Sequence, residues 1–147
     1  ALPNLDLLCN VMGVISSNKE DKLCEEAVEN LLIKTPSVEV NAANLSGGNQ
    51  QKVVVGKWLA RNSRVVIFDE PTRGIDVGAK SEIYKLINAL AERGKTIIVI
   101  SSELPEIIRC CHRVLVMCEG RLTGEVTGED IDQDIMMKFA TQRSKGE

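Results

Sequence analysis

The segment Val65-Val66-Ile67-Phe68-Asp69-Glu70 is an apolar run that ends in two adjacent acids. A continuous apolar run of this length predicts a strand that is buried on both faces, as in parallel sheets. Thr96 to Ile100 and Val114 to Met117 are two further apolar runs, and helical patterns separate the three. The sequence from residue 65 onward therefore predicts an α/β fold with a parallel sheet covered by helices.

Helical periodicity and breaking residues define the other elements. Ser17 with Glu20 matches a capping box at the start of the firmest helical pattern, and Thr35-Pro36 ends that helix. Glu119-Gly120 predicts a turn that makes the following strand antiparallel to its predecessor. The predicted helices cover residues 4–15, 17–35, 49–62, 78–93, 105–111 and 130–142, and the fourth strand covers 121–126. Residues 1–44 thus form a helical part, and residues 45–147 form an α/β part.

Composition restricts the classes of function. The 147 residues carry 18 Lys plus Arg against 21 Asp plus Glu, and the net charge of −3 provides no basic surface for nucleic acid. The apolar runs are too short to span a bilayer. The start at Ala1, without an initiator Met or a signal segment, is typical of a piece of a longer protein. Five cysteines without a CxxC pair favour reduced thiols in the cytoplasm and give no metal-binding pattern, Cys110-Cys111-His112 included.

Asp69 and Glu70 stand where open α/β sheets bind ligands, at the carboxyl end of a strand. In phosphoryl transfer the first acid can hold a magnesium ion, and the second can orient or deprotonate the attacking water. Taken alone, the same pattern also fits a strand that ends at the surface in solvated carboxylates. The bare pair of acids leaves both interpretations open.

A second segment, Leu45-Ser46-Gly47-Gly48, stands at the predicted start of a helix. Glycines let backbone N–H groups approach a phosphate closely, Ser46 adds a hydroxyl donor, and the helix N-terminus presents its positive dipole end. A Gly-Gly turn with a serine cap is the alternative interpretation.

Together, three linked motifs resemble the ABC-transporter ATPase family in order and spacing. Leu45 to Lys52 resembles the family's signature motif, Phe68 to Thr72 its Walker B segment and catalytic glutamate, and Gly74-Ile75-Asp76 its D-loop. The wording of 49–52 and 73–80 looks like the second cassette of monosaccharide importers that carry two cassettes in one chain. The resemblance covers essentially the whole chain, with 1–44 matching part of the helical subdomain and 45–147 the C-terminal catalytic part of a P-loop NTPase core.

The resemblance implies a composite ATP site, in which the signature of one cassette presses on ATP held by the other cassette. It assigns nucleotide contacts to Ser46, Gly47, Gly48, Gln50 and Asp76. It assigns Mg²⁺ to Asp69 and catalysis to Glu70 and Ser102. The expected partners are the other cassette, transmembrane permease subunits and a sugar-binding protein. The expected location is peripheral, at the cytoplasmic face of the inner membrane, and nucleic acid is not an expected partner.

Two departures from the family pattern shape the expectations for this chain. No GxxxxGK[ST] phosphate loop occurs. Ala89 to Thr96 matches the motif only at its end, Gly94-Lys95-Thr96, since Ala89 replaces the first glycine. This segment also runs from a helix to a strand, whereas the motif runs from a strand to a helix. We therefore expect the isolated chain to be inactive and interpret Gly94 as a helix stop. Ser102 also stands where the family places a switch histidine, which puts hydrolysis at the Glu70 site in doubt.

The alternatives are a soluble ABC ATPase that acts outside transport, or an inactive interaction module. The absent phosphate-loop strand would lie between residues 96–100 and 113–118 in this family. Because unpaired strand edges do not stay dry, we expect either direct pairing of these two strands or a second chain at the edge, with a homodimer favoured.

Overall fold

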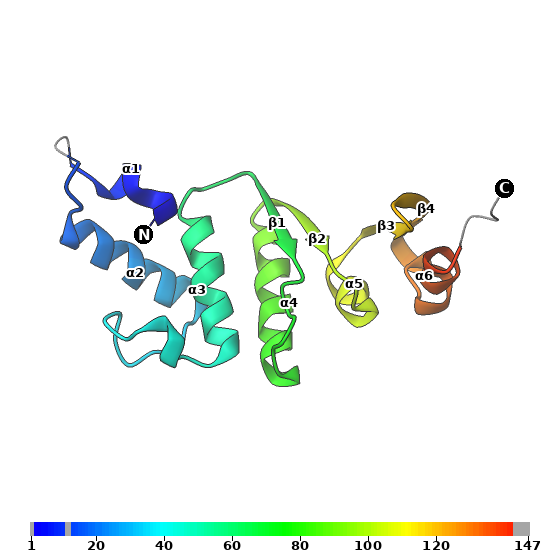
Figure 1. The fold of residues 1–147 in the computed structure, drawn as a ribbon, viewed down its shortest axis with the longest axis horizontal. Helices are drawn as coiled ribbons and strands as arrows, with labels where there is room; N and C mark the ends of the chain where they lie inside the picture. Colours follow the sequence, from blue (N-terminus) through cyan, green and yellow to red (C-terminus); the bar gives the residue numbers. More distant parts are fainter. Residues whose placement is uncertain (1, 11–12, 143–147) are drawn as a thin grey trace. The chain divides into compact units, whose positions relative to one another are not determined.

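The computed structural model describes residues 2–10 and 13–142 (Figure 1). The helices within these ranges are α1 (Leu5–Leu8), α2 (Ser17–Leu31), α3 (Gly47–Leu59), α4 (Val77–Glu92), α5 (Leu104–Cys110) and α6 (Gln133–Ala140). The strands are β1 (Val65–Asp69), β2 (Thr96–Ile100), β3 (Arg113–Cys118) and β4 (Arg121–Thr127). Two compact units result, one of residues 1–67 with 71–98 and one of residues 68–70 with 99–147. These units differ from the predicted subdomains, residues 1–44 and 45–147, and that division stays a prediction.

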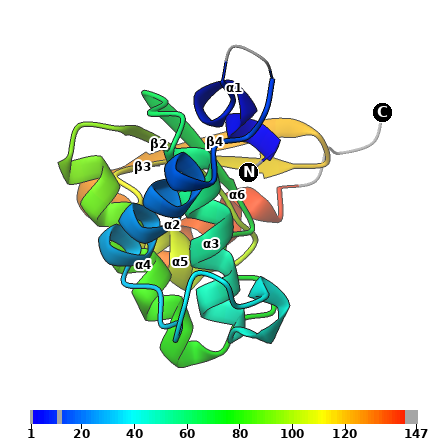
Figure 2. The same cartoon turned by 90° about the vertical axis from the view of Figure 1, so that its left-hand side faces the viewer.

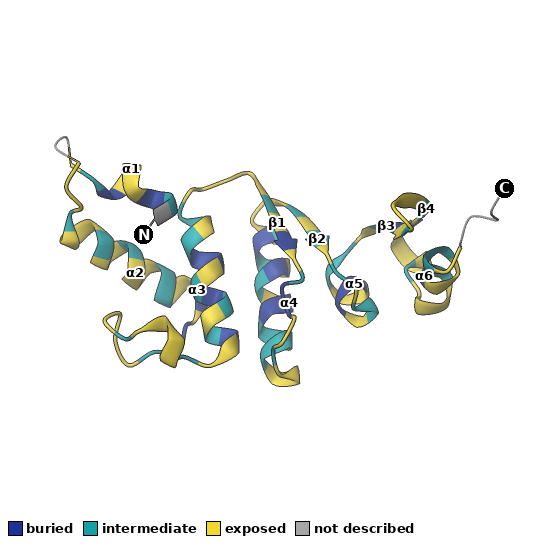
Figure 3. Cartoon of the chain, viewed as in Figure 1, coloured by how far each residue is buried: buried dark blue, intermediate teal, exposed yellow. Residues whose placement is uncertain are grey.

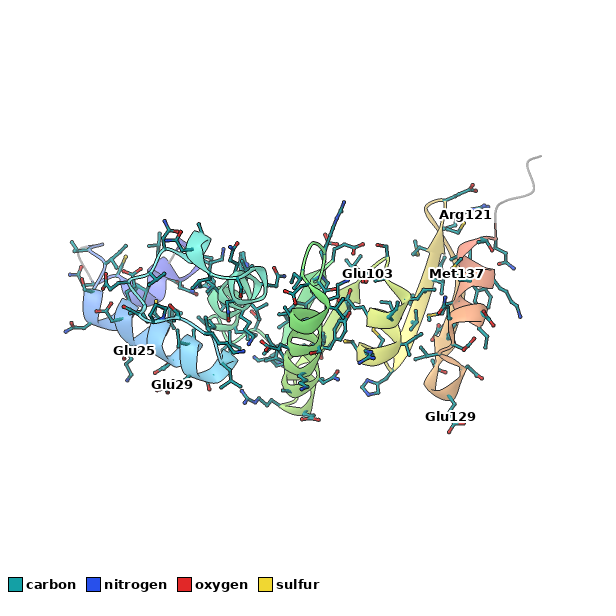
Figure 4. All side chains as sticks on the ribbon, turned by 90° about the horizontal axis from the view of Figure 1, so that it is seen from below. Glu25, Glu29, Glu103, Arg121, Glu129 and Met137 are labelled. Carbon is teal, nitrogen blue, oxygen red and sulfur yellow. The ribbon has the colours of Figure 1, made fainter. Side chains whose placement is uncertain are left out.

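Three helices make up the core of the first unit. Helix α3 contacts both α2 and α4, and Figure 2 views these helices from the α2 side. Ile83, Ile87 and Leu90 repeat at helical spacing along α4 and are at most 4% exposed, so this face of α4 is the best-buried part of the unit. Helix α2 has a solvent-exposed face, from which Glu25 and Glu29 project (Figure 4).

Strands β1 and β2 pair in parallel, as predicted. The Thr96 N–H donates to the Arg64 carbonyl at 2.9 Å, and the Glu70 N–H donates to the Ile100 carbonyl at 2.8 Å. Their burial differs from the prediction, because alternate side chains are exposed: Ile67 is 62% and Ile100 52% exposed (Figure 3). An apolar run indicates that a strand can be buried on both faces, but it does not reveal which segment covers each face.

The second unit contains an antiparallel hairpin covered by α6. Strands β3 and β4 pair from Arg113 with Thr127 to Cys118 with Arg121, across the predicted turn at Glu119-Gly120. Both turn residues have positive φ, 50° and 75°, which is the conformation of a tight type I′ hairpin turn. Helix α6 packs on both strands, and the buried core is made of Ile107, Val116, Val126 and Met136.

Two predictions for the N-terminal region are wrong, namely the length of the first helix and the cap of the second. The helix predicted over residues 4–15 ends at Leu8, because Cys9 forms an antiparallel bridge with Ile15 and the chain turns at Gly13, whose φ is +76°. Met12, which contributed to that prediction, lies outside the described residues. Helix α2 begins after Ser16, which is the N-cap residue without a side-chain cap bond, so the predicted Ser17 capping box is wrong. The same helix ends at Leu31, before Thr35-Pro36, with Leu32 in the left-handed conformation.

Direct pairing between residues 96–100 and 113–118 does not form. In the described part of the chain, β2 pairs with β1 and β3 pairs with β4, in two separate two-stranded sheets. The Glu119-Gly120 turn gives β3 a partner on one edge at little cost in loop closure, whereas pairing with β2 would have to close the longer segment 101–112. A second chain at the edge stays a prediction. No described helix is both long and apolar enough to cross a membrane.

Candidate functional site

The Leu45 to Lys52 segment forms the N-terminal end of α3, as its glycines and serine predict. Ser46 is the N-cap residue in an extended conformation, and the first helical bond runs from the Gln50 N–H to the Ser46 carbonyl at 2.9 Å. The N–H groups ahead of that bond have no intrahelical acceptor, as at every helix start. Ser46 and Gly47 are exposed, so this end of the helix offers donors and a positive dipole end to an anion.

Two amide side chains fix the segment ahead of the helix. Asn49 donates through Nδ2 to the Ser46 hydroxyl at 2.8 Å and accepts the Lys34 N–H at 2.9 Å. Gln50 donates through Nε2 to the Leu45 carbonyl at 2.8 Å. The predicted nucleotide contact of Gln50 stays a prediction, and its amide nitrogen in this structure holds the loop.

The two glycines of this segment have different surroundings. A Cβ added to Gly47 would meet nothing within 4 Å, whereas one added to Gly48 would lie 2.7 Å from the Cβ of Ala79 on α4. Gly48 is buried, so the absence of its side chain lets α3 and α4 approach closely. Sequence reasoning assigned Gly48 to phosphate approach or to a Gly-Gly turn, and it missed this packing.

Asp76 is the N-cap residue of α4. Its carboxylate accepts the Ala79 N–H at 3.0 Å, and it is exposed. The preceding turn closes with a bond from the Ile75 N–H to the Thr72 carbonyl at 3.2 Å, and Gly74 has a φ of +75°. Because Ala79 also contacts Gly48, the starts of α3 and α4 lie side by side.

The second unit brings Glu70 and Ser102 together. Glu70 follows β1 with a φ of 46°, a left-handed conformation that is costly for a residue with a Cβ and is concentrated at functional sites. Its backbone N–H donates to Ile100, and its Oε1 accepts the backbone N–H of Ser102 at 3.0 Å. The predicted pair is therefore adjacent, through the main chain of Ser102 rather than its hydroxyl.

Asp69 is the last residue of β1 and is exposed. A single strand-end carboxylate suits Mg²⁺, which keeps several waters and is bound in nucleotide sites through one or two carboxylates plus phosphates. In the part of the chain that the structure describes, no group of three or more His, Cys, Asp or Glu side chains could hold an ion alone. The donor set fits magnesium that arrives with a nucleotide.

The segment from Ala89 to Thr96 does not form a phosphate-binding loop. Helix α4 ends at Glu92, Gly94 has a φ of +83°, and β2 begins at Thr96, so the prediction of Gly94 as a helix stop is confirmed. Lys95 donates to the Ser63 carbonyl at 2.8 Å and thereby ties the chain ahead of β2 to the chain ahead of β1.

Sequence reasoning missed Lys52 and Glu82. Lys52 is 4% exposed although it is charged, and its Nζ lies 2.8 Å from Glu82 Oε2 on α4. The motif placed Lys52 on α3, but nothing in the sequence identified an acid on a later helix as its partner.

Comparison with protein families matches residues 3–73 to the ABC transporter family. A putative ribose/galactose/methyl galactoside import ATP-binding protein of Albidiferax ferrireducens is 64% identical over 121 residues, which are 82% of this chain and 24% of that protein. A xylose import ATP-binding protein of Thermoanaerobacter pseudethanolicus is 52% identical over 141 residues, which are 96% of this chain and 28% of that protein. The chain thus spans about a quarter of the length of the curated relatives it matches.

Solved structures give the same comparison at the level of the fold. An ATP-binding cassette of an ABC transporter has a TM-score of 0.72 and 22% identity, over 84% of this chain and 50% of the cassette. A bacterial ABC transporter cassette solved as a dimer has a TM-score of 0.67 and 25% identity, over 86% of this chain and 53% of the cassette. The predicted α/β fold of a truncated cassette is confirmed.

Proposed function

Because this chain belongs to the ABC transporter ATPase family, we propose that it is part of the ATP-hydrolysing subunit of a bacterial monosaccharide importer. The main observation behind this proposal is that the Glu70 carboxylate, at the carboxyl end of β1, is fixed by a hydrogen bond from the Ser102 N–H. A carboxylate fixed beside a ligand-binding sheet edge is the group that water activation requires. The sugar class follows from the import proteins for ribose, galactose and xylose that the chain resembles.

All predicted site residues except Gln50 have a role in this proposal. Glu70 accepts the proton of the water that attacks the terminal phosphate, and the Ser102 N–H holds Glu70 in place. Asp69 would hold magnesium, which when bound neutralises charge on the transferred phosphate. Ser46, Gly47 and Gly48 at the start of α3 contribute N–H donors to the nucleotide of a second cassette, with Asp76 beside them.

The proposed assembly includes the parts that this chain does not contain. A phosphate loop from the remainder of the cassette would cradle ATP, and closure of two cassettes would drive a permease in the membrane. The ATPase would lie at the cytoplasmic face of that membrane, with a sugar-binding protein on the other side. Selectivity for one sugar would reside in those partners.

Transport by the complete importer in membrane vesicles tests the proposal. We expect ATP-dependent uptake of a labelled ribose, galactose or xylose, which Glu70→Gln abolishes and Glu92→Gln preserves. Glu92 is the matched control, since it is an exposed glutamate at the end of α4. Uptake of none of these sugars, or uptake that is insensitive to Glu70→Gln, would contradict the proposal.

A further inference from the structure

Lys52 is a buried cation one helical turn after Gly48 on α3. Its side chain is 6% exposed, and its ammonium contacts two groups from different segments. It donates to the carbonyl of Leu32, the left-handed residue that ends α2, at 3.0 Å, and it pairs with Glu82 of α4 at 2.8 Å. One ammonium on α3 therefore contacts both the C-terminal end of α2 and a side chain of α4.

Glu82 is held on α4 by two lysines. Lys52 Nζ lies at 2.8 Å and Lys34 Nζ at 3.6 Å from its two carboxylate oxygens. The hydrogen bond and the charge of Lys52, with the weaker effect of Lys34, lower the pKa of Glu82 below its ordinary value. Glu82 is thus ionised at neutral pH, and it balances the charge that Lys52 buries.

The contact of Lys52 with Glu82 repeats the contact of Gly48 with Ala79 one turn further along both helices. Positions three and four apart face the same side of a helix, so these four residues form one continuous line of contact. We call these four residues the α3–α4 seam. Ser46 stands two residues before the seam on α3 and Asp76 three residues before it on α4, so the seam fixes the two motifs relative to each other.

We propose that Lys52 is a positioning residue, which sets the register of the signature segment against the D-loop through its ion pair with Glu82. This inference rests on the proposed function for its effect on turnover, because both motifs would act on the nucleotide of a second cassette.

Burial explains why a charge suits this role better than an apolar side chain. A well-packed apolar residue could match the stability of a buried ion pair, but it would not specify one register. A slip of α3 along α4 by one turn, roughly 5.4 Å, would leave the ammonium buried without its partner. Glu82 is partly exposed but the Lys52 ammonium is buried, and leaving a buried charge without its counter-ion is unfavourable, so the pair favours the native alignment.

The test uses the complete ATPase with Lys52→Met, Lys52→Arg and Glu82→Gln, and with Lys85→Met as control. Lys85 is an exposed lysine on α4, outside the seam. We expect Lys52→Met and Glu82→Gln to lower kcat by about ten- to a hundredfold, since small misplacements of site residues cost rate on this scale. KM for ATP changes much less than kcat, because the phosphate loop that would hold most of the nucleotide lies outside the seam. Lys52→Arg recovers most of kcat.

Hydrogen exchange provides a readout that needs no turnover. The helical amides of residues 50–53, of which the first bonds to the Ser46 carbonyl, should exchange faster in Lys52→Met and Glu82→Gln than in the parent protein, and at the parent rate in Lys85→Met. Glu82 is partly exposed, so its variant serves if Lys52→Met fails to fold. A parent protein that binds ATP without hydrolysing it would count against the proposed function, and exchange would still decide the role of Lys52. Unaltered exchange and kcat in both seam variants would overturn the proposal.

Discussion

Adding a methyl group at Gly48 tests the close approach of α3 and α4. The added Cβ would lie 2.7 Å from the Ala79 Cβ, whereas carbon atoms in contact keep about 3.5–4.0 Å. The helices must therefore separate by about 1 Å, and overpacking of this kind costs about 1–3 kcal/mol. Alanine is a better helix former than glycine by up to about 1 kcal/mol, and the position in the first turn reduces this gain. We expect Gly48→Ala to lower the free energy of unfolding by about 1–2 kcal/mol.

The compensating variant separates the steric effect from every other effect of the alanine. Ala79→Gly removes the methyl group that the new Cβ would strike, so Gly48→Ala becomes neutral or stabilising in that background. Gly47→Ala is the matched control, because its added Cβ meets nothing within 4 Å. Urea unfolding followed by the fluorescence of Trp58, on α3, measures the four variants. If Gly48→Ala lowers the free energy of unfolding equally in the parent and in the Ala79→Gly background, the packing argument is refuted.

Two other groups give shorter tests. Ser102→Ala keeps the N–H that donates to Glu70, so kcat should change less than about threefold. Ser102→Pro removes that donor and should lower kcat about tenfold or more. A large loss of kcat in Ser102→Ala would assign the role to the hydroxyl. Burial, with help from Cys111 and Glu106, raises the pKa of Cys110 from 9.0 to about 11, so iodoacetamide followed by mass spectrometry should label it at pH 8 more slowly than free cysteine. Its folded pKa lies above the unfolded value, so its contribution to stability is present below about pH 9 and is lost as the pH rises toward 11. A stability curve between pH 9 and 11 that Cys110→Ala leaves unchanged would contradict this origin.

The elements that the sequence predicted well are those that local patterns determine. Strand β2 was predicted at its observed bounds, because Thr96 to Ile100 is an apolar run between a glycine stop and polar residues. The N-terminal prediction failed because the bridge between Cys9 and Ile15 competes with helical periodicity, and such pairing is not visible in a periodic pattern.

The candidate site divides in the same way. Motif order and spacing placed Ser46 at a helix start, Glu70 at the end of a strand and Asp76 in the loop before a helix. In the structure Ser46 and Asp76 are N-cap residues and Glu70 directly follows β1. The contacts that hold those residues come from positions far along the chain. Gly48 meets Ala79, Lys52 meets Glu82, and Glu70 meets the main chain of Ser102. These pairings depend on tertiary packing, which residue type and spacing do not encode.

ATP turnover by the complete importer with Glu70→Gln measures whether Glu70 activates the attacking water. Equilibrium binding of ATP and the rate of phosphate release are measured for the parent protein, for Glu70→Gln and for the control Glu92→Gln. We predict that Glu70→Gln binds ATP with unchanged affinity and releases phosphate about a hundredfold more slowly or worse, because the amide cannot accept the proton of the attacking water. Phosphate release at the parent rate in Glu70→Gln would show that Glu70 is not the group that accepts this proton.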